Sequence, residues 1–294
     1  MRINALFIMI AAALWGIISI FVTGLHIVGF SSMEIVALRM FFSAVILALF
    51  LVIKDRKYLK IKLKDIPLFC GTGICSIVFF NYCYFQAIDI MGSSAVPALL
   101  LYTAPIFVMF MSLILFKEKI TIRKVVALVL TILGMCFLTG IFFGRAKISL
   151  TGFLYGIGSG FGYALYSIFG KFLLKRYSSI TITLYTFVTA SIVTLPLLLV
   201  NDNFQLVLRQ DSLLISLGLA LFSTIIPYLL YTKGLQKIEP GRASILATIE
   251  PFVAAIVGVV IFNEVITFEK IMGMALILCS IILLNIKSDK KHLR

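Results

Sequence analysis

Long apolar stretches separated by short polar breaks run through the whole chain. Each stretch is close to the roughly 20 residues that an α-helix needs to cross about 30 Å of hydrocarbon. The breaks reach only about a dozen residues, which is too short for a folded soluble domain. The pattern therefore predicts an all-α membrane protein with ten transmembrane helices. They cover residues 4–24, 34–53, 67–88, 93–116, 123–141, 151–170, 180–200, 212–232, 241–262 and 269–287.

The second half of the chain repeats the first half at a constant shift of 146 residues. The match is clearest at prolines, glycines and helix-end charges, which tolerate few substitutes. An internal repeat of this kind defines the architecture. We predict two five-helix repeats, residues 1–147 and 148–294, and the odd number of helices per repeat makes them inverted relative to each other. Matching pairs are Gly16 and Gly162, Gly24 and Gly170, Phe41 and Phe187, Asp65 and Asp211, Tyr82 and Tyr228, Pro105 and Pro251, Glu118 and Glu264, and Lys124 and Lys270.

The composition agrees with the membrane class. Hydrophobic residues make up 62% of the chain and charged residues only 13%, against about 25% charged residues in soluble proteins. The first apolar stretch is interpreted as a retained helix, because only Arg2 precedes it and no Ala-x-Ala-like cleavage site follows. The five cysteines lie within apolar stretches without metal-type spacing, so we interpret them as small core residues.

The positions of lysine and arginine predict the orientation, because such residues near helix ends are retained on the cytoplasmic side. If both termini are inside, nearly all basic residues at helix ends lie on the inner side. Arg39 is an exception, because it lies within the second predicted helix. This arrangement predicts a multi-pass protein of the cytoplasmic membrane. Of the 26 lysines and arginines, the outer segments then hold Arg145, Lys147, Arg209 and Lys270.

The formal net charge of +14 follows from this inner-face bias. No basic patch interleaved with aromatic residues accompanies it, so we predict no nucleic-acid partner. Anionic lipid headgroups on the inner face of the bilayer are a sufficient partner for the basic loops.

An inverted repeat is typical of secondary transporters, in which a site near the midplane is exposed alternately to each side. Pro105 and Pro251 each remove a backbone donor and are expected to bend the fourth and ninth helices. Such bends line transporter cavities, although prolines in membrane helices also serve packing alone. The sequence has no HExxH, GxSxG or phosphate-loop motif, so we predict no enzyme and no cofactor or metal site.

Short motifs in both halves carry a family resemblance. They are Trp15-Gly16, Leu38-Arg39, Pro105 followed by Phe-Lys-Glu-Lys-Ile-Thr at 116–121, and Glu250-Pro251 followed by Phe-Asn-Glu-Val-Ile-Thr at 262–267. In these residues the chain resembles the drug/metabolite transporter superfamily, in its ten-helix EamA-type branch, over essentially its whole length. The resemblance implies a carrier of small metabolites, with amino-acid export a frequent activity and amphipathic or cationic solutes also represented.

Glu250 is the leading candidate for a functional side chain. Of the twelve acidic residues, it alone lies deep in an apolar stretch, about 13 Å from the inner end of its helix and close to the midplane. A carboxylate at this depth is costly and normally serves a pathway, a coupling proton or a cationic ligand. The alternative is a packing role, in which it accepts hydrogen bonds from a neighbouring helix. Its repeat partner is Ala104, so either role is confined to one half.

Arg39 is the only basic residue well inside a predicted span, about 8 Å from the outer end of its helix. The first interpretation is that its side chain snorkels to the headgroups. The alternative is a contact with an anion, such as a substrate carboxylate, or an ion pair with Glu250.

Aromatic and amide side chains form the remaining candidates. The sets Tyr82, Phe85, Gln86 and Tyr228, Tyr231, Thr232 match at the repeat shift, and each has the i, i+3, i+4 spacing of one helix face. They are interpreted either as gates at opposite ends of a cavity or as parts of the aromatic belt. Aromatic walls can hold an apolar metabolite, or a cation through the ring faces. Further predicted lining residues are Trp15, Asn81, Tyr84, Tyr102 and Tyr163.

These features predict a secondary transporter that moves a small metabolite across the cytoplasmic membrane by alternating access. Export of an amino acid or related compound is the first hypothesis. The alternatives are a carrier for an organic cation such as a quaternary amine, and a membrane-embedded binding component that translocates nothing. Ten helices with internal pseudo-symmetry suffice for a monomer and equally permit a homodimer.

Overall fold

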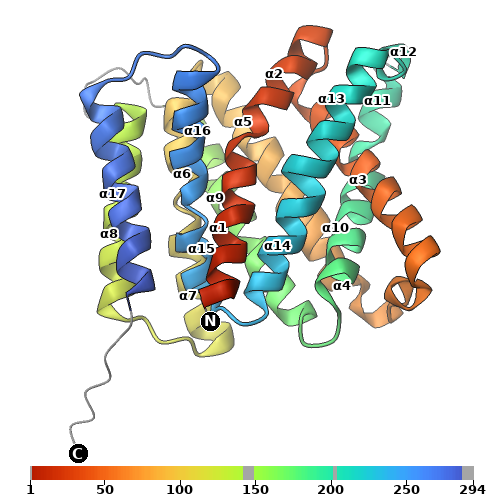
Figure 1. Cartoon of the computed structure of the whole chain (residues 1–294), viewed down its shortest axis with the longest axis horizontal. Coiled ribbons are helices and arrows are strands. Elements are labelled where there is room, and N and C mark those ends of the chain that lie inside the picture. The colour runs from red at the N-terminus through yellow and green to blue at the C-terminus, as the bar shows by residue number, and fades with distance from the viewer. Residues whose placement is uncertain (1, 142–148, 201–203, 287–294) are drawn as a thin grey trace, which may run out of the picture.

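The computed structural model describes residues 2–141, 149–200 and 204–286. Over these ranges the chain folds into helices that run side by side along one direction (Figure 1). The predicted boundary between the repeats, at residues 147 and 148, lies outside the described residues. So do the predicted outer residues Arg145 and Lys147 and the predicted inner residues Lys287, Lys290, Lys291 and Arg294.

The helices follow the order of the predicted spans. In the first part of the chain they are α1 (Arg2–Gly16), α2 (Ile18–Val28), α3 (Ser32–Lys54), η1 (Arg56–Leu59), η2 (Leu63–Asp65), α4 (Ile66–Cys70), η3 (Gly71–Val78), α5 (Phe79–Met91), α6 (Ala95–Leu101), α7 (Ala104–Phe116) and α8 (Ile122–Thr139). In the second part they are α9 (Leu150–Leu173), α10 (Ser179–Thr194), α11 (Pro196–Val200), α12 (Phe204–Val207), α13 (Gln210–Ala220), η5 (Leu221–Ile225), α14 (Ile226–Leu235), α15 (Pro240–Leu246), α16 (Ile249–Val260) and α17 (Phe268–Asn285).

Among the described residues, nine helical segments are long and apolar enough to cross a membrane. The remaining predicted span is α9, which has 24 residues but contains many glycines and tyrosines that lower its hydropathy. The glycines let α9 pack closely inside the bundle. A Cβ added at Gly156 would lie 2.3 Å from Leu100 Cδ1, and one at Gly160 would lie 2.6 Å from Thr103 Oγ1. The predicted all-α architecture is therefore confirmed, with α9 as its least apolar member.

Four predicted helices are interrupted. The first is divided at Ile17 into α1 and α2, and the seventh at Leu195 into α10 and α11, which the apolar pattern did not predict. The fourth and ninth are interrupted at residues 102–103 and 247–248, just before Pro105 and Pro251. Each proline occupies the first turn of the following helix, where its missing N–H is tolerated. The fourth and ninth helices are consequently irregular about half-way through the bundle.

Two π-helical segments occupy corresponding positions in the two halves. They are η3 in the third predicted helix and η5 in the eighth, and the sequence analysis predicted neither. The wider turn lets the Thr224 hydroxyl donate to the carbonyl of Leu219, five residues earlier, at 2.9 Å. Such segments are frequent where a helix contributes to a functional site.

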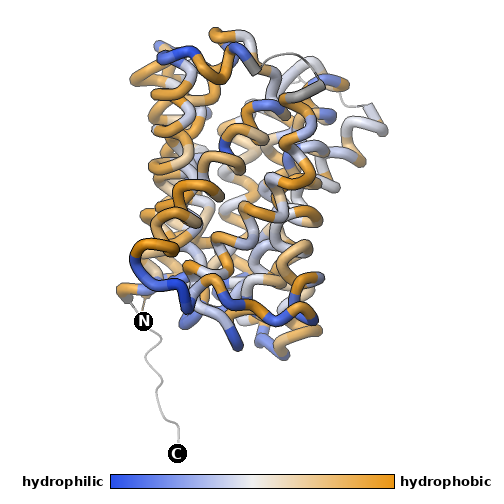
Figure 2. The backbone as a smooth tube through the Cα atoms, turned by 90° about the vertical axis from the view of Figure 1, so that its right-hand side faces the viewer, coloured by the Kyte–Doolittle hydropathy of each residue, from blue (hydrophilic) through white to orange (hydrophobic). Residues whose placement is uncertain are grey.

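The two halves have opposite orientations. We call the end of the bundle where α1 begins and α17 ends the N-terminal face, and the opposite end the far face (Figure 1). Helix α8 runs from the N-terminal face to the far face, and its repeat equivalent α17 runs back beside it. Hydrophobic positions cover the length of the helices, and hydrophilic segments gather at the two ends (Figure 2). This arrangement confirms the predicted inverted repeat.

The halves pack against each other throughout. Helix α1 contacts α14 and α16, α3 contacts α10, and α5 contacts α9. A site in the centre of the bundle is therefore built from both repeats.

Candidate functional site

A cavity of about 630 Å³ lies between the two repeats. Its deepest residues include Glu250 and Tyr163, which lie about half-way along the bundle, and its lining continues to His26 and Asp89 at the far face. Both His26 and Asp89 are exposed. The cavity therefore opens at the far face.

Glu250 is the second residue of α16 and directly follows the break after α15. The hydroxyl of Tyr163 donates to its Oε2 atom at 3.0 Å, and Tyr102 also interacts with the carboxylate. Helix α1 approaches this segment closely at Gly16, where an added Cβ would lie 2.8 Å from the carbonyl oxygen of Glu250. A carboxylate has about four acceptor sites, so these contacts leave acceptor capacity for a ligand in the cavity.

Arg39 comes from α3, in the other repeat, and lines the same cavity. Its side chain is buried, with 7% of the residue exposed, so it does not snorkel to the surface. Its Nε and Nη2 atoms have no hydrogen-bond partner within the described parts of the chain. The structure thus brings one cationic and one anionic side chain to a single cavity.

An aromatic cluster closes the cavity towards the N-terminal face. We call it the aromatic plug, and it consists of Trp15, Tyr166, Tyr228 and Tyr231. The ring centroid of Trp15 lies 5.1 Å from that of Tyr228 and 5.4 Å from that of Tyr231. The space left between these rings is only about 10 Å³, roughly what one water molecule needs. No metabolite can pass through the plug in this conformation.

Hydrogen bonds hold the plug in place. The Tyr166 hydroxyl lies 2.6 Å from Thr232 Oγ1, and the Tyr231 hydroxyl lies 2.7 Å from Ser167 Oγ. Both pairs join α9 to α14, so the tyrosines of the plug form one unit of the second repeat. Trp15 is the contribution of the first repeat.

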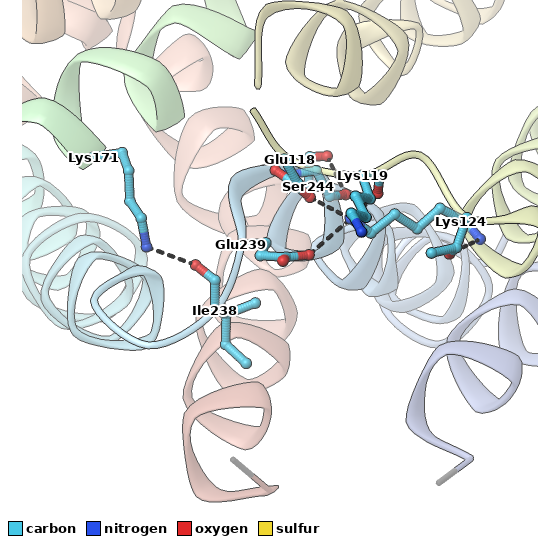
Figure 3. A network of polar contacts seen from close by, with 9 residues as sticks. Glu118, Lys119, Lys124, Lys171, Ile238, Glu239 and Ser244 are labelled. Carbon is cyan, nitrogen blue, oxygen red and sulfur yellow. Dashed lines mark hydrogen bonds and ion pairs between the residues drawn. The ribbon is translucent and has the colours of Figure 1, made fainter. Parts of the chain in front are cut away.

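A polar network forms a second closure, at the N-terminal face (Figure 3). Lys124 Nζ lies 2.5 Å from Glu118 Oε1 and 2.8 Å from Glu239 Oε2. Glu118 also accepts a hydrogen bond from the backbone N–H of Gly241 at 3.3 Å. Glu118 and Lys124 belong to the first repeat, and Glu239 and Gly241 belong to the second. We call these four residues the latch, because their contacts join the two repeats.

The loop that carries Glu239 is itself stabilised. Lys171, at the end of α9, donates to the carbonyl of Ile238 at 3.0 Å (Figure 3). Partial burial raises the pKa of Glu239, but the hydrogen bond and positive charge of Lys124 outweigh burial and hold the pKa below its ordinary value. Glu239 is therefore charged at neutral pH.

The repeat equivalents of Glu118 and Lys124 are Glu264 and Lys270, at the mouth of the cavity. We call them the far-face pair. Lys270 Nζ lies 2.8 Å from Glu264 Oε2. Among the described residues, neither side chain forms an ion pair with the first repeat. The same two residue types thus join the repeats at the N-terminal face and leave them apart at the far face.

Most of the predicted site residues border this cavity. The plug contains Tyr231, which does not line the main cavity. Tyr82 is 46% exposed, packs against Tyr155 and lies away from the cavity, as does Gln86. Only Phe85 of that triplet lines the cavity, so no aromatic gate forms at the far face here. The predicted residues in the lining are Trp15, Arg39, Asn81, Tyr84, Tyr102, Tyr163, Tyr228, Glu250 and Pro251.

The sequence analysis missed several residues of the two closures. Tyr166 lies three residues after Tyr163, a spacing that shares a helix face and could have identified it. Glu239 carried no such signal, because its partner Lys124 is 115 residues away in the sequence.

Comparison with known proteins assigns the family. The sequence model of the EamA-like transporter family matches residues 2–140 and 150–286. The chain belongs to this family. EamA-like transporters are part of the drug/metabolite transporter superfamily, so the resemblance found in the sequence motifs is confirmed.

Relatives of this EamA-like transporter cover nearly the whole chain. An uncharacterized transporter of Archaeoglobus fulgidus is 30% identical over 285 residues, which are 96% of each chain. The uncharacterized transporter YwfM of Bacillus subtilis is 25% identical over 99% of this chain and 96% of its own. A solved crystal structure superposes with a TM-score of 0.81 over 96% of each chain, and at 14% identity this likeness shows the fold alone. The protein is therefore a multi-pass membrane transporter of small molecules.

Proposed function

We propose that this EamA-like transporter is a secondary carrier of the cytoplasmic membrane whose exported cargo is an amino acid or a related metabolite. One observation carries the proposal: the Glu250 carboxylate faces a cavity that is open at one face and closed at the other. The N-terminal face is taken as cytoplasmic, because lysines and arginines concentrate in the segments that end there.

The inverted repeats supply the second state of the transport cycle. In the described conformation the plug and the latch close the N-terminal face. If the repeats exchange conformations, the far face closes and the N-terminal face opens around the same central site. Cargo bound near Glu250 then moves from one side of the membrane to the other without a continuous pore.

Glu250 is suited to bind either an ammonium group or a proton. A carboxylate without a cation is costly in a membrane interior. The exchange of the two conformations is therefore favoured when Glu250 carries either a proton or the ammonium group of the cargo. Competition between the two cations for one carboxylate couples cargo export to proton entry. This scheme uses no residue outside the cavity.

A carrier for an organic cation is the second candidate function. The rings of Trp15 and Tyr163 are 6.4 Å apart beside Glu250, and Tyr102 also lines this part of the cavity. Aromatic faces together with one carboxylate are a sufficient site for a quaternary ammonium ion.

Flux measurements on purified protein in liposomes test the proposal. The protein amino acids and choline are first ranked by their effect on thermal unfolding, and the best of them is then followed in flux assays with and without a pH gradient. We expect a pH gradient to drive flux in the wild type. In Glu250→Gln, which keeps the side-chain shape, we expect flux to fall about 10-fold or more. The remaining flux should be the same with and without the pH gradient.

Asp89→Asn is the matched control, because Asp89 is an exposed acid of the same cavity and should leave both properties unchanged. Flux that responds equally to the gradient in Glu250→Gln would show that Glu250 is not the coupling site. Saturable binding with no flux of any solute would instead favour a membrane-embedded binding component.

A further inference from the structure

The guanidinium of Arg39 is a buried cation that lacks a partner. The residue is 7% exposed, and no carboxylate within the described parts of the chain forms an ion pair with it. Its Nε and Nη2 atoms donate to nothing there. Unpaired buried donors cost free energy, and more so when they carry charge. An anionic ligand in the cavity would pair with these donors and remove this cost.

The two unpaired nitrogens form one edge of the guanidinium. Nε–H and Nη2–H point in parallel from that edge, which is the geometry that binds both oxygens of a carboxylate. The two atoms are themselves covered, whereas the residue as a whole borders the cavity. Binding of a carboxylate at this edge therefore requires a rotation about the terminal side-chain bonds.

The equivalent position in the second repeat holds no cation. The repeat equivalent of Arg39 is Tyr185, which donates to the carbonyl of Leu59 at 2.6 Å and serves local packing. The groups that act on Arg39 electrostatically are Tyr228 and Glu250, both in the cavity wall. Arg39 and Glu250 form no direct ion pair, so each keeps its binding capacity for a ligand placed between them.

We infer that Arg39 is the carboxylate subsite of the transporter and that the cargo is a zwitterion. Its carboxylate binds the Nε and Nη2 edge of Arg39, its ammonium group binds Glu250, and its carbon body lies against the aromatic lining, such as Trp15 and Phe80. This inference rests on the proposed function and narrows it, because an organic cation without a carboxylate leaves Arg39 unpaired.

Cargo analogues that differ in one charged group test the subsite. For whichever protein amino acid shows the largest flux in liposomes, competition is measured with its primary amide and with its decarboxylated amine. Both analogues keep the amine and lack the carboxylate. We expect each to compete about 10- to 100-fold more weakly than the amino acid, as for loss of a hydrogen-bonded charge.

Variants at Arg39 separate binding of the carboxylate from a structural role. Arg39→Gln should lose the discrimination between the amino acid and its amide, and Arg39→Lys should keep part of it, because it retains the charge without the paired donors. Arg123→Gln, an exposed arginine at the N-terminal face, is the control and should discriminate like the wild type.

The outcomes are distinguishable. The subsite is overturned, and the proposed transport left intact, if the amide and the amine compete as strongly as the amino acid in wild-type protein, or if Arg39→Gln keeps full discrimination. Preferential flux of choline over every amino acid also overturns it. If no amino acid, amide, amine or choline is moved at all, the proposed function itself fails. If Arg39→Gln does not fold, the comparison of analogues on wild-type protein and Arg39→Lys decides.

Discussion

Lys117 and Asn263, which are 146 residues apart, adopt the same left-handed backbone conformation, each with a φ of 54°. They are the only non-glycine residues with positive φ in the described parts of the chain. In each turn, the next N–H donates to a carbonyl six residues earlier, Glu118 to Ser112 at 3.2 Å and Glu264 to Gly258 at 3.0 Å. The two turns share this φ and this hydrogen bond, whereas the partners of the latch and of the far-face pair differ.

Removal of the Glu118 carboxylate should open the N-terminal face. The Glu118 carboxylate joins the repeats by accepting from the backbone N–H of Gly241 at 3.3 Å, and a hydrogen bond to a charged group contributes about 1.5–3 kcal/mol. Glu118→Gln should therefore shift the closure equilibrium by roughly 10- to 100-fold. Labelling of Ser76→Cys by a membrane-impermeant thiol reagent, in protein without its native cysteines, reports this change. Ser76 lies beside the plug and its hydroxyl has no described hydrogen-bond partner, so the reporter removes no contact.

Two controls accompany this experiment. Glu239→Gln removes a carboxylate that is 61% exposed, so its effect should stay within about 1 kcal/mol. Asp55→Asn removes an exposed pair with Lys57 in the loop after α3 and should have no effect. Equal labelling rates in Glu118→Gln and wild-type protein would show that the latch does not hold the face closed.

The far-face pair should approach the first repeat when the N-terminal face opens. The repeat equivalents of Glu239 and Gly241 are Ser93 and Ala95, so the chain near Ser93 is the expected partner of Glu264 and Lys270. Spin labels at Ser93 and Val265 should move closer on opening of the N-terminal face, while labels at the equivalent positions Glu239 and Lys119 should separate. Pulsed dipolar spectroscopy with and without Glu118→Gln measures both distances. A change at one face without the opposite change at the other contradicts an exchange between the repeats.

The number and inversion of the helices could be predicted because burial in lipid demands an apolar stretch for every crossing. The interruption at Ile17 and the π-helical segments could not be predicted from the sequence. Residues on both sides of Ile17 are apolar, so hydropathy carries no signal for the break. Bends at Pro105 and Pro251 were expected, because a missing N–H is visible in the sequence itself, and the structure has a break just before each.

The candidate site shows a similar division. Glu250 was identifiable because a single carboxylate in an apolar stretch stands out from its neighbours. The snorkelling interpretation of Arg39 failed because distance from the helix end does not specify which side of the helix faces the bundle interior. Tyr82 was interpreted either as a gate, by its match to Tyr228, or as part of the aromatic belt, and the two equivalent positions differ in exposure, 46% against 6%. The repeat predicts where equivalent side chains lie along the helices. Which of these side chains contact each other depends on the conformational state.

The close approach of α1 to α16 should be essential for placing Glu250. A Cβ at Gly16 would lie 2.7 Å from Val253 Cβ and 2.8 Å from the carbonyl oxygen of Glu250. Gly16→Ala must therefore push the two helices apart, at a cost of about 1–3 kcal/mol, and it displaces the carboxylate from Tyr163. We expect a lower thermal unfolding temperature in detergent and weaker binding of the cargo.

Gly170→Ala is the matched control for this change. Its added Cβ would lie 3.6 Å from Leu235 Cδ2, an ordinary contact distance, and helix α9 gains from the better propensity of alanine. We expect its unfolding temperature to be unchanged or higher. Because Gly16 lies next to the cavity and Gly170 lies towards the N-terminal face, a loss of binding confined to Gly16→Ala would tie the effect to the position of Glu250. Equal behaviour of the two variants would mean that the contact between α1 and α16 tolerates an added methyl group and does not set that position.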